Sequence, residues 1–362
     1  MIPPRLGIGR VIGYMGKTGT GVILFFFFVK FDRVEQVARI FVTRRLPFWE
    51  EVGKPLTSAG HEVVVSDPGR AVGREEMEAE LEKGYDGVLT MLTDRIDAAL
   101  LEHDKNKRLK IIANYAVGFD NIDVEACRAR GIAVTNTPSD KVNESVAEHA
   151  WTLMLALSRR VVEAHEFMRN AAYRGWEPDI FLGQDLAGKT VGIVGMGRIG
   201  EMVARREKGF GMRALYFNRK RIETEREKEN GVEYCESLEE LIKRSDYVTL
   251  HVPLTNETKH LINGKNLPLF KKGAFLVNTA RGAVVNEAEV VEALRAGMLG
   301  GYATDVYENE PNPHPELLQM ANVIMTPHIA SATVAARRDM GEIAVLNLVE
   351  VLSGREAPNK AV

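Results

Sequence analysis

The sequence lacks the features that mark several large classes of protein. It has only two cysteines in 362 residues, Cys127 and Cys235, and neither belongs to a C-x-x-C pair, so a disulfide framework and a cysteine zinc site are both disfavoured. It also lacks an excess of charge of one sign, because 47 Lys and Arg face 50 Asp and Glu. We therefore expect no nucleic-acid partner and no attraction to an anionic membrane. With 45% hydrophobic and 27% charged residues, the composition indicates a cytoplasmic globular protein.

A hydrophobic run long enough to cross a membrane is not found either. Residues 22–29 read V-I-L-F-F-F-F-V, well short of the roughly 20 residues that a span needs. Lys17 precedes this run, but no small-x-small cleavage site follows it, so a signal peptide is disfavoured. We expect residues 1–37 to be an extension that is either disordered or placed before the true start of the protein, with no membrane partner.

The rest of the chain alternates between strand and helix patterns. At roughly 150 residues per domain, the length suggests two domains. Helix patterns cover residues 48–59, 74–83 and, as one long helix, 145–168. Short β-branched and aromatic runs predict strands at residues 38–43, 61–65, 87–90, 110–113, 132–135, 189–194, 213–217, 247–250, 274–277 and 322–325. Strands that alternate with helices pair in parallel, which predicts an α/β layer architecture.

A glycine pattern in the second half of the chain predicts a dinucleotide site. Gly195, Gly197 and Gly200 form a G-x-G-x-x-G that directly follows a predicted strand and opens a helix, the context that this pattern requires. The first glycine permits the tight turn, the second lets the backbone approach a pyrophosphate, and the third allows close helix–strand packing. A glycine-rich turn that binds nothing is the alternative reading.

The residues after the next predicted strand indicate which dinucleotide is preferred. A carboxylate is expected there when the ligand is NAD, because it hydrogen-bonds the ribose hydroxyls. This sequence has Asn218, Arg219, Lys220 and Arg221 instead, and these cations would pair with a 2′-phosphate. We therefore expect NADPH to be preferred, with NADH as the alternative cofactor. The other reading is that these cations only begin a solvated, charged helix.

Three C-terminal segments combine a polar side chain with turn residues. They carry Arg281 in residues 277–282, Glu310 in residues 304–311 and His328 in residues 326–333. Ligands of open α/β sheets bind beyond the carboxyl ends of the strands, which makes these residues candidates for catalysis. Each also has a structural reading, as a strand cap, a Glu-Pro turn or a packing histidine.

Taken together, these segments resemble the D-isomer-specific 2-hydroxyacid dehydrogenase family, and within it the glyoxylate/hydroxypyruvate reductase branch. The resemblance runs from about residue 38 to the C-terminus, and its motifs are residues 114–123, 192–200, 277–282, 305–311 and 327–332. It implies an α/β fold of two Rossmann-like domains, each a doubly wound parallel sheet, with the active site in the cleft between them. The substrate domain would comprise residues 38–137 and 327–362, and the dinucleotide-binding domain residues 138–326.

The resemblance also implies a reaction and a role for each site residue. The reaction would be NAD(P)H-dependent reduction of a small 2-oxo acid, glyoxylate or hydroxypyruvate. Arg281 would hold the substrate carboxylate and polarise the ketone, His328 would donate the proton, and Glu310 would bond the other imidazole nitrogen. Substrate contacts would come from Thr93, Val117, Gly118 and Arg281. Cofactor contacts would come from Gly195, Gly197, Arg198, Ile199, Gly200, Asn218, Arg219, Lys220, Thr279 and Asp305, the last through the nicotinamide carboxamide.

We also expect no metal and a homodimer, and three alternative functions remain open. The other histidines show no metal-ligand spacing, so no metal is expected; Trp176 and the 145–168 helix suggest a homodimer through that region. The alternatives are a D-lactate dehydrogenase, a phosphoglycerate dehydrogenase, or a cofactor-sensing binding protein like the corepressors built on the same fold.

Overall fold

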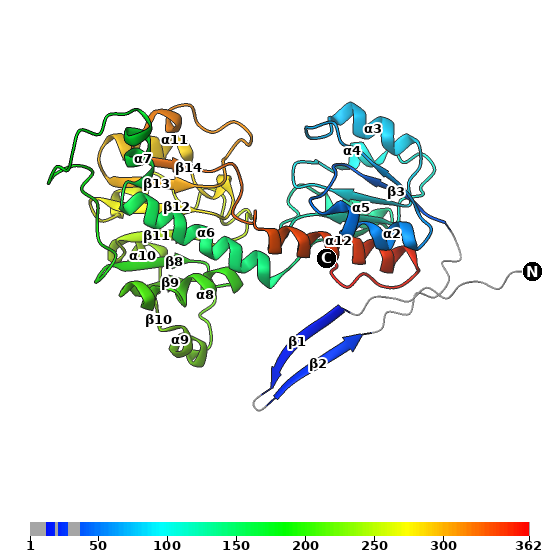
Figure 1. Ribbon diagram of the computed structural model, residues 1–362, viewed down its shortest axis with the longest axis horizontal. Helices are drawn as coiled ribbons and strands as arrows, with labels where there is room; N and C mark the ends of the chain where they lie inside the picture. Colours follow the sequence, from blue (N-terminus) through cyan, green and yellow to red (C-terminus); the bar gives the residue numbers. More distant parts are fainter. Residues whose placement is uncertain (1–11, 19–20, 28–36, 362) are drawn as a thin grey trace, which may run out of the picture. The chain divides into compact units, whose positions relative to one another are not determined.

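Two parallel β-sheets organise the computed structural model, which describes residues 12–18, 21–27 and 37–361 (Figure 1). By its contacts the chain divides into a discontinuous unit, Met1–Thr137 with Met340–Val362, and a central unit, Pro138–Asp339. The central unit extends past the boundary expected after residue 326. The reason is local: the His328 amide donates to the carbonyl of Asp305, and Lys141 pairs with Asp339 at 2.7 Å.

The central unit contains a seven-stranded, entirely parallel sheet in the order β10-β9-β8-β11-β12-β13-β14. If β8 is counted as strand 1, the strands from β10 to β13 have the order 3-2-1-4-5-6, which is that of a dinucleotide-binding fold. The switch point of this order lies between β8 and β11. The strands are β8 (Thr190–Val194), β9 (Arg213–Phe217), β10 (Val232–Tyr234), β11 (Tyr247–Leu250), β12 (Ala274–Asn278), β13 (Leu299–Thr304) and β14 (Val323–Met325).

Two helices stand where the sequence predicts one long helix over 145–168. Helix α6 (Asp140–Ser158) begins with the Ser139 side chain accepting the amide of Lys141, and a second helix, α7 (Val161–Arg169), follows it. The break occurs because Arg160 adopts a left-handed conformation, with φ of 52°. The other helices of this unit are α8 (Arg198–Ala204), η1 (Glu207–Phe210), α9 (Thr224–Asn230), α10 (Leu238–Arg244), η2 (Leu267–Leu269), η3 (Gly282–Val284), α11 (Glu287–Arg295) and η4 (Leu317–Gln319).

The discontinuous unit contains a five-stranded parallel sheet in the order β4-β3-β5-β6-β7. From its first strand this order is 2-1-3-4-5, the other common doubly wound arrangement, with its switch point between β3 and β5. Its strands are β3 (Arg39–Val42), β4 (Glu62–Val65), β5 (Gly87–Thr90), β6 (Ile111–Asn114) and β7 (Ala133–Thr135). Its helices are α1 (Trp49–Val52), α2 (Lys54–Ser58), α3 (Arg74–Glu82), α4 (Ala98–Leu101) and α5 (Val124–Ala129), while α12 (Val334–Leu352) begins in the central unit. The prediction of an α/β protein with two doubly wound parallel sheets is confirmed.

The N-terminal extension contains paired strands where we expected disorder or a misplaced start. Strand β1 (Ile12–Thr18) runs antiparallel to β2 (Gly21–Phe27). β-branched and aromatic residues favour extended backbone, which accounts for β2. The remaining residues of the extension, up to residue 36, lie outside the part of the chain that the structure describes.

Buried apolar strands form the cores of both units. Every residue of β8, β11 and β12 is buried, as is every residue of β5 and β6. Parallel sheets have both faces covered by helices, so their strands are apolar on both sides rather than alternating. Among the described residues, no helix combines the length and apolarity that a membrane crossing demands.

Candidate active site

The glycine turn after β8 forms a cradle with room for a ligand. Gly195 has a φ of 98°, and a Cβ there would lie 2.5 Å from the carbonyl oxygen of His251. A Cβ on Gly200 would lie 2.1 Å from the oxygen of Gly195, so only glycine fits at either position. At Gly197, by contrast, nothing lies within 4 Å of an added Cβ. The turn therefore presents open backbone at the start of α8, which suits the pyrophosphate of a dinucleotide.

Arg198 and Ile199, the two residues between Gly197 and Gly200, have different surroundings. Arg198, the first residue of α8, is exposed, whereas Ile199 is partly buried against the core of the central unit. Ile199 therefore anchors the helix start, and the Arg198 side chain is accessible to a ligand at the turn.

Three exposed cations follow β9, and one of them, Arg221, is fixed by hydrogen bonds to a buried carboxylate. Arg221 forms two hydrogen bonds to Glu227, at 2.7 and 2.8 Å, and Glu227 also accepts the hydroxyl of Tyr216 at 2.6 Å. Arg219 and Lys220 are exposed. They precede α9, which begins only at Thr224, so they lie in a loop rather than in a charged helix.

Asn218 shapes that loop. Its side-chain amide donates to the carbonyl oxygen of Lys220 at 3.1 Å. This bond closes a short turn at the carboxyl end of β9, beside the glycine turn of β8. Exposed cations at this edge fit the predicted phosphate contact.

His328 and Glu310 form a hydrogen-bonded pair. The Nδ1 atom of His328 lies 3.0 Å from Oε2 of Glu310, and the two side chains remain 29% and 36% exposed. The other carboxylate oxygen, Oε1, accepts the amide of Tyr307 at 3.2 Å. Because Glu310 engages Nδ1, the Nε2 atom is the nitrogen left to meet a substrate. His328 adopts a φ of 55°, a strained conformation that surrounding structure must hold.

Asp305 supplies that support. Its fully buried carboxylate accepts the amides of Ile329 and Ala330 at 2.8 and 2.7 Å, and the hydroxyl of Thr326 at 2.5 Å. Burial raises its pKa, but hydrogen bonds from His149, Thr326 and the two amides lower it by more, so the net shift is downward. Asp305 thus fixes the loop around His328. The sequence predicts a cofactor contact for Asp305 but not this structural role.

Arg281 follows β12, the strand beside β13. Asn278 holds its backbone, because the Asn278 amide donates to the carbonyl of Arg281 at 2.9 Å and its oxygen accepts the amide of Ala280 at 3.0 Å. The Arg281 guanidinium donates to the Ala280 carbonyl at 2.8 Å. Thr279 is buried, and among the described residues its Oγ1 has no hydrogen-bond partner, which leaves this hydroxyl available to a bound cofactor.

The predicted catalytic residues follow adjacent strands. Arg281 follows β12, Glu310 lies on the long loop after β13, and His328 follows β14. The loops of Arg281 and Glu310 also touch, because a Cβ on Gly282 would lie 1.8 Å from the carbonyl carbon of Tyr307. The structure therefore brings together His328 and Glu310, and it packs the Arg281 loop against the backbone of the loop that carries Glu310.

In the discontinuous unit, asparagines orient the predicted substrate loop. The carbonyl of Val117 accepts the amide of Asn136 at 2.7 Å, and that of Gly118 accepts the amide of Asn114 at 3.0 Å. In a trans peptide the N–H points opposite to the carbonyl, so the Gly118 amide faces away from Asn136. This arrangement suits backbone binding of a carboxylate.

Thr93 lies on a second loop at the same edge, after β5, and is exposed. The neighbouring Asp94 is buried, and its carboxylate accepts the hydroxyl of Thr43 at 2.5 Å and the amide of Met91 at 2.8 Å. Burial raises the pKa of Asp94 above its ordinary value. These bonds join the loops after β3 and β5 at the switch point of this sheet, where ligands bind in such folds.

Two buried or partly buried histidines of the central unit make contacts that the sequence does not reveal. His149 on α6 places Nε2 3.0 Å from the hydroxyl of Thr326 and 3.6 Å from Asp305, although its position in the sequence suggests only packing. His251, at the end of β11, places Nε2 2.9 Å from the Thr249 hydroxyl, and burial lowers its pKa to about 3. The contacts of His149 join residues far apart in sequence, and the pKa shift of His251 depends on its burial. No local pattern in the sequence marks either feature.

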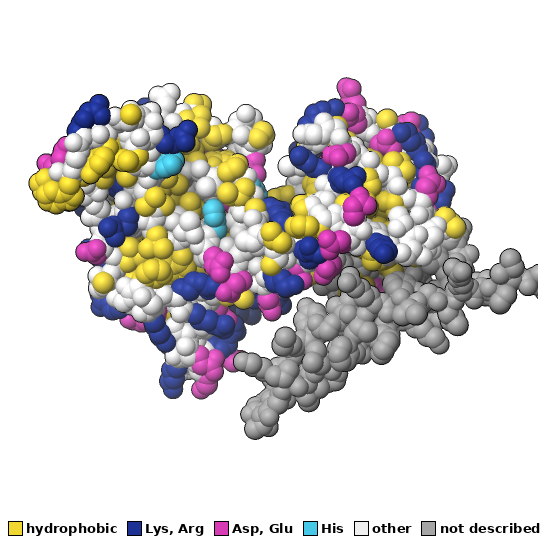
Figure 2. Space-filling view, in the orientation of Figure 1, with side chains coloured by type: hydrophobic (Ala, Val, Ile, Leu, Met, Phe, Trp, Pro, Cys, Tyr) yellow, Lys and Arg dark blue, Asp and Glu magenta, His cyan; other side chains and the backbone are white. Residues whose placement is uncertain are grey.

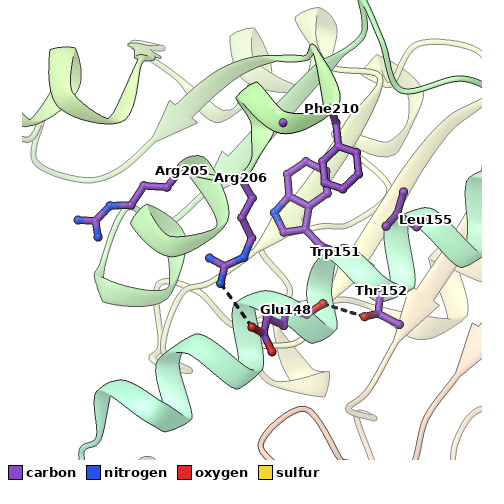
Figure 3. A pocket seen from close by; sticks show the side chains of 8 residues that line it. Glu148, Trp151, Thr152, Leu155, Arg205, Arg206 and Phe210 are labelled. Carbon is purple, nitrogen blue, oxygen red and sulfur yellow. Dashed lines mark hydrogen bonds and ion pairs between the residues drawn. The ribbon is translucent and has the colours of Figure 1, made fainter.

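A cavity of about 610 Å³ lies elsewhere on the central unit, between α6 and the segment of α8 and η1. In Figure 3, Trp151 lies against Phe210 while Arg206 points toward Glu148, 3.7 Å away. None of the predicted site residues lines this cavity. In the described ranges 12–18, 21–27 and 37–361, no group of His, Cys, Asp or Glu is arranged to hold a metal ion.

Comparisons with known proteins agree with this geometry. Residues 151–330 match the family model described as D-isomer specific 2-hydroxyacid dehydrogenase, NAD binding domain. A glyoxylate reductase of Thermococcus kodakarensis is 46% identical over 324 residues, which cover 88% of this chain and 95% of the relative.

Solved structures of similar proteins give the same result. A glyoxylate reductase from Paecilomyes thermophila is 32% identical with a TM-score of 0.79, covering 90% of this chain and 98% of its own. An NADPH-dependent glyoxylate/hydroxypyruvate reductase from Sinorhizobium meliloti, solved in complex with NADP and malonate, is 31% identical with a TM-score of 0.77, covering 90% and 97%.

Proposed function

The chain belongs to the D-isomer specific 2-hydroxyacid dehydrogenase family, and on this premise we propose that it reduces glyoxylate to the 2-hydroxy acid with a nicotinamide cofactor. The observation that carries the proposal is the His328–Glu310 pair, 3.0 Å apart, in a chain that is 46% identical to a glyoxylate reductase. Hydroxypyruvate, a larger 2-oxo acid, is the second proposed substrate.

His328 is the proton donor in this proposal. Reduction of a ketone requires a proton at the developing alkoxide, and Nε2 carries it while Glu310 holds Nδ1. The carboxylate fixes the ring orientation and favours the protonated imidazole. The nicotinamide cofactor supplies the hydride that goes to the carbonyl carbon.

Arg281 binds the substrate. A guanidinium stays charged at any working pH and matches the planar carboxylate of a 2-oxo acid, while its charge polarises the ketone. Thr93 and the amides of Val117 and Gly118 are the proposed further contacts to the substrate.

NADPH is the proposed preferred cofactor. The glycine cradle after β8 fits a dinucleotide, and exposed Arg219 and Lys220 stand where an NAD-specific site would have a carboxylate. The similar reductase from Sinorhizobium meliloti is NADPH-dependent, which supports this choice. Thr279 and Asp305 are the proposed contacts near the nicotinamide.

A homodimer through the α6–α7 region is the proposed assembly. Helix α7 has no buried residue, and apolar side chains gather on the loop that follows it (Figure 2). On that loop Trp176 is 80% exposed and Leu182 is 67% exposed, an apolar surface that a partner would cover. Trp176→Asp combined with Leu182→Asp should convert a dimer into a monomer in analytical ultracentrifugation.

A steady-state assay tests the function. Glyoxylate, hydroxypyruvate and pyruvate are each incubated with NADPH or NADH, and the absorbance of the reduced cofactor is followed. We expect turnover with glyoxylate and hydroxypyruvate and a higher kcat/KM with NADPH. The similarity of this chain to glyoxylate reductases does not favour the alternative functions. These are a D-lactate dehydrogenase, a phosphoglycerate dehydrogenase and a corepressor-like binding protein. If none of the three 2-oxo acids is reduced with either cofactor, the proposal that this chain is a 2-oxo acid reductase is wrong.

A further inference from the structure

One buried carboxylate, Glu287, ties the loop that carries Glu310 to helix α11. Glu287 is the first residue of that helix and is only 3% exposed. Its Oε1 accepts the amide of Glu308 at 2.9 Å, and its Oε2 accepts the amide of His314 at 3.2 Å. These two amides lie on either side of Glu310 in the sequence. A single side chain therefore holds both ends of the segment that presents Glu310 to His328.

Glu308 extends this link to two more loops. One oxygen of Glu308 lies 2.6 Å from Nε2 of His260, and the other accepts the amide of Glu287 at 3.4 Å. The backbone amide of His260 in turn donates to the carbonyl of Ala283 at 2.8 Å. The loops after β11, β12 and β13 thus meet at one cluster of hydrogen bonds.

A carboxylate is a costly group to place here. Burial raises the pKa of Glu287, while the amides of Glu308 and His314 lower it by less. The neighbouring Glu308 carboxylate raises the pKa of Glu287 further, and the charge of His314 lowers it. An apolar side chain would fill the same space without this desolvation cost. The two amide hydrogen bonds offset part of this cost, and both of them act on the Glu310 segment.

We infer that Glu287 is a positioning residue for the reaction: it holds residues 308–314 so that the Glu310 carboxylate meets Nδ1 of His328. This inference rests on the proposed function, in which His328 donates the proton. Glu287 makes no contact with the glycine turn after β8, so its loss should reduce the rate of the chemical step and spare cofactor binding.

Glu287→Gln tests the inference with little change in shape. The amide oxygen can still accept one N–H, but the amide nitrogen faces the other N–H and cannot accept it. We expect kcat for glyoxylate reduction to fall about 10- to 100-fold, while the NADPH Kd, measured by cofactor fluorescence, stays within about twofold. Glu292→Gln, an exposed position of the same helix, is the matched control and should change neither value. An unchanged kcat in Glu287→Gln would overturn the inference.

A double-mutant cycle distinguishes positioning from a general loss of structure. If Glu287 acts through Glu310, then adding Glu287→Gln to Glu310→Gln should cost almost nothing beyond the loss caused by Glu310→Gln alone. Losses that multiply would show that Glu287 acts independently of Glu310, and would overturn the inference.

Amide hydrogen exchange of the unaltered protein gives a readout that needs neither a mutant nor activity. The amides of Glu308 and His314 should exchange slowly, because both donate to a buried carboxylate. Fast exchange at either amide would overturn the inference even if Glu287→Gln fails to fold. A chain that reduces no 2-oxo acid would refute the proposed function and leave this measurement of the Glu287 link intact.

Discussion

The Nδ1 atom of His328 lies 3.0 Å from Oε2 of Glu310, although 18 positions separate the two residues in the chain. The pair depends on three backbone constraints: Asp305 holds the loop of His328, Glu287 holds the loop of Glu310, and Gly282 lets the Arg281 loop pack against Tyr307. The following predictions test these constraints and the proposed cofactor site.

Removal of the two exposed cations after β9 should weaken NADPH binding selectively. Arg219→Ala combined with Lys220→Ala should raise the KM for NADPH about tenfold or more, because even one charge–phosphate contact contributes about 1.5 kcal/mol. The KM for NADH should change little. Lys272→Ala, an exposed lysine before β12, is the control. Equal increases for the two cofactors would contradict the 2′-phosphate contact.

Gly282→Ala should inactivate the protein. A Cβ at this position would lie 1.8 Å from the carbonyl carbon of Tyr307, so the Arg281 loop would have to separate from the Glu310 loop. Overpacking of this kind costs about 1–3 kcal/mol or more, and we expect kcat to fall by about 100-fold, since misplaced catalytic groups are that costly. Gly209→Ala, where an added Cβ meets open space, should have wild-type kcat and Tm. A fully active Gly282→Ala would show that the two loops are not packed as described.

Asp305 should contribute to stability at neutral pH and lose that contribution in acid. Its pKa is lowered in the folded protein, so its contribution to the free energy of unfolding is present above the unfolded pKa of about 3.9 and disappears as the pH falls through the folded value. Asp305→Asn should therefore lower the free energy of unfolding by about 1–3 kcal/mol near pH 7, and the difference should shrink below about pH 4.

Urea unfolding across the pH range measures this difference. Asp179→Asn, at an exposed position, is the control and should match the wild type. A destabilisation by Asp305→Asn that grows in acid would contradict the assigned direction of the pKa shift.

Both thiols should resist alkylation while the protein is folded. Cys127 and Cys235 are buried, and burial raises the pKa of each thiol to about 11. At pH 8 only about one thiol in a thousand would be ionised, and the thiolate is the reactive form. A thiol reagent should label neither cysteine in buffer and both in denaturant. Rapid labelling of the folded protein would place at least one thiol at the surface.

Most strands that carry the fold were predictable from local patterns, and three features of the central unit were not. One is β10, which is only three residues long (Val232–Tyr234). Strand β13 escaped prediction because Gly300 and Gly301 resemble a turn. They are glycines because a Cβ would lie 2.4 Å from the oxygen of Gly273 or 2.7 Å from that of Asn322. The break between α6 and α7 also escaped, since the left-handed conformation of Arg160 has no glycine or proline to mark it.

The site shows the same division. Glu310 follows β13, which was not predicted, so it was expected from its Glu-Pro turn and the family resemblance, and the catalytic roles of all three residues stay predictions. The places of Arg281 and His328 were predictable, because each follows a predicted strand and parallel strands bring their carboxyl ends to one edge. His149 and Glu287 were not, because their contacts join residues that are 177 positions apart for His149 and Thr326 and 21 positions apart for Glu287 and Glu308. Such pairings depend on tertiary packing, which no local spacing records.

If His328 donates the proton in 2-oxo acid reduction, His328→Gln should remove the chemical step and leave cofactor binding in place. Initial rates of glyoxylate reduction with NADPH are measured together with the NADPH Kd, and His165→Gln, an exposed histidine on α7, is the matched control. We expect kcat to fall about 10²- to 10⁴-fold in His328→Gln, the NADPH Kd to stay unchanged, and His165→Gln to be fully active. A His328→Gln variant that reduces glyoxylate at the wild-type rate would show that His328 is not the proton donor.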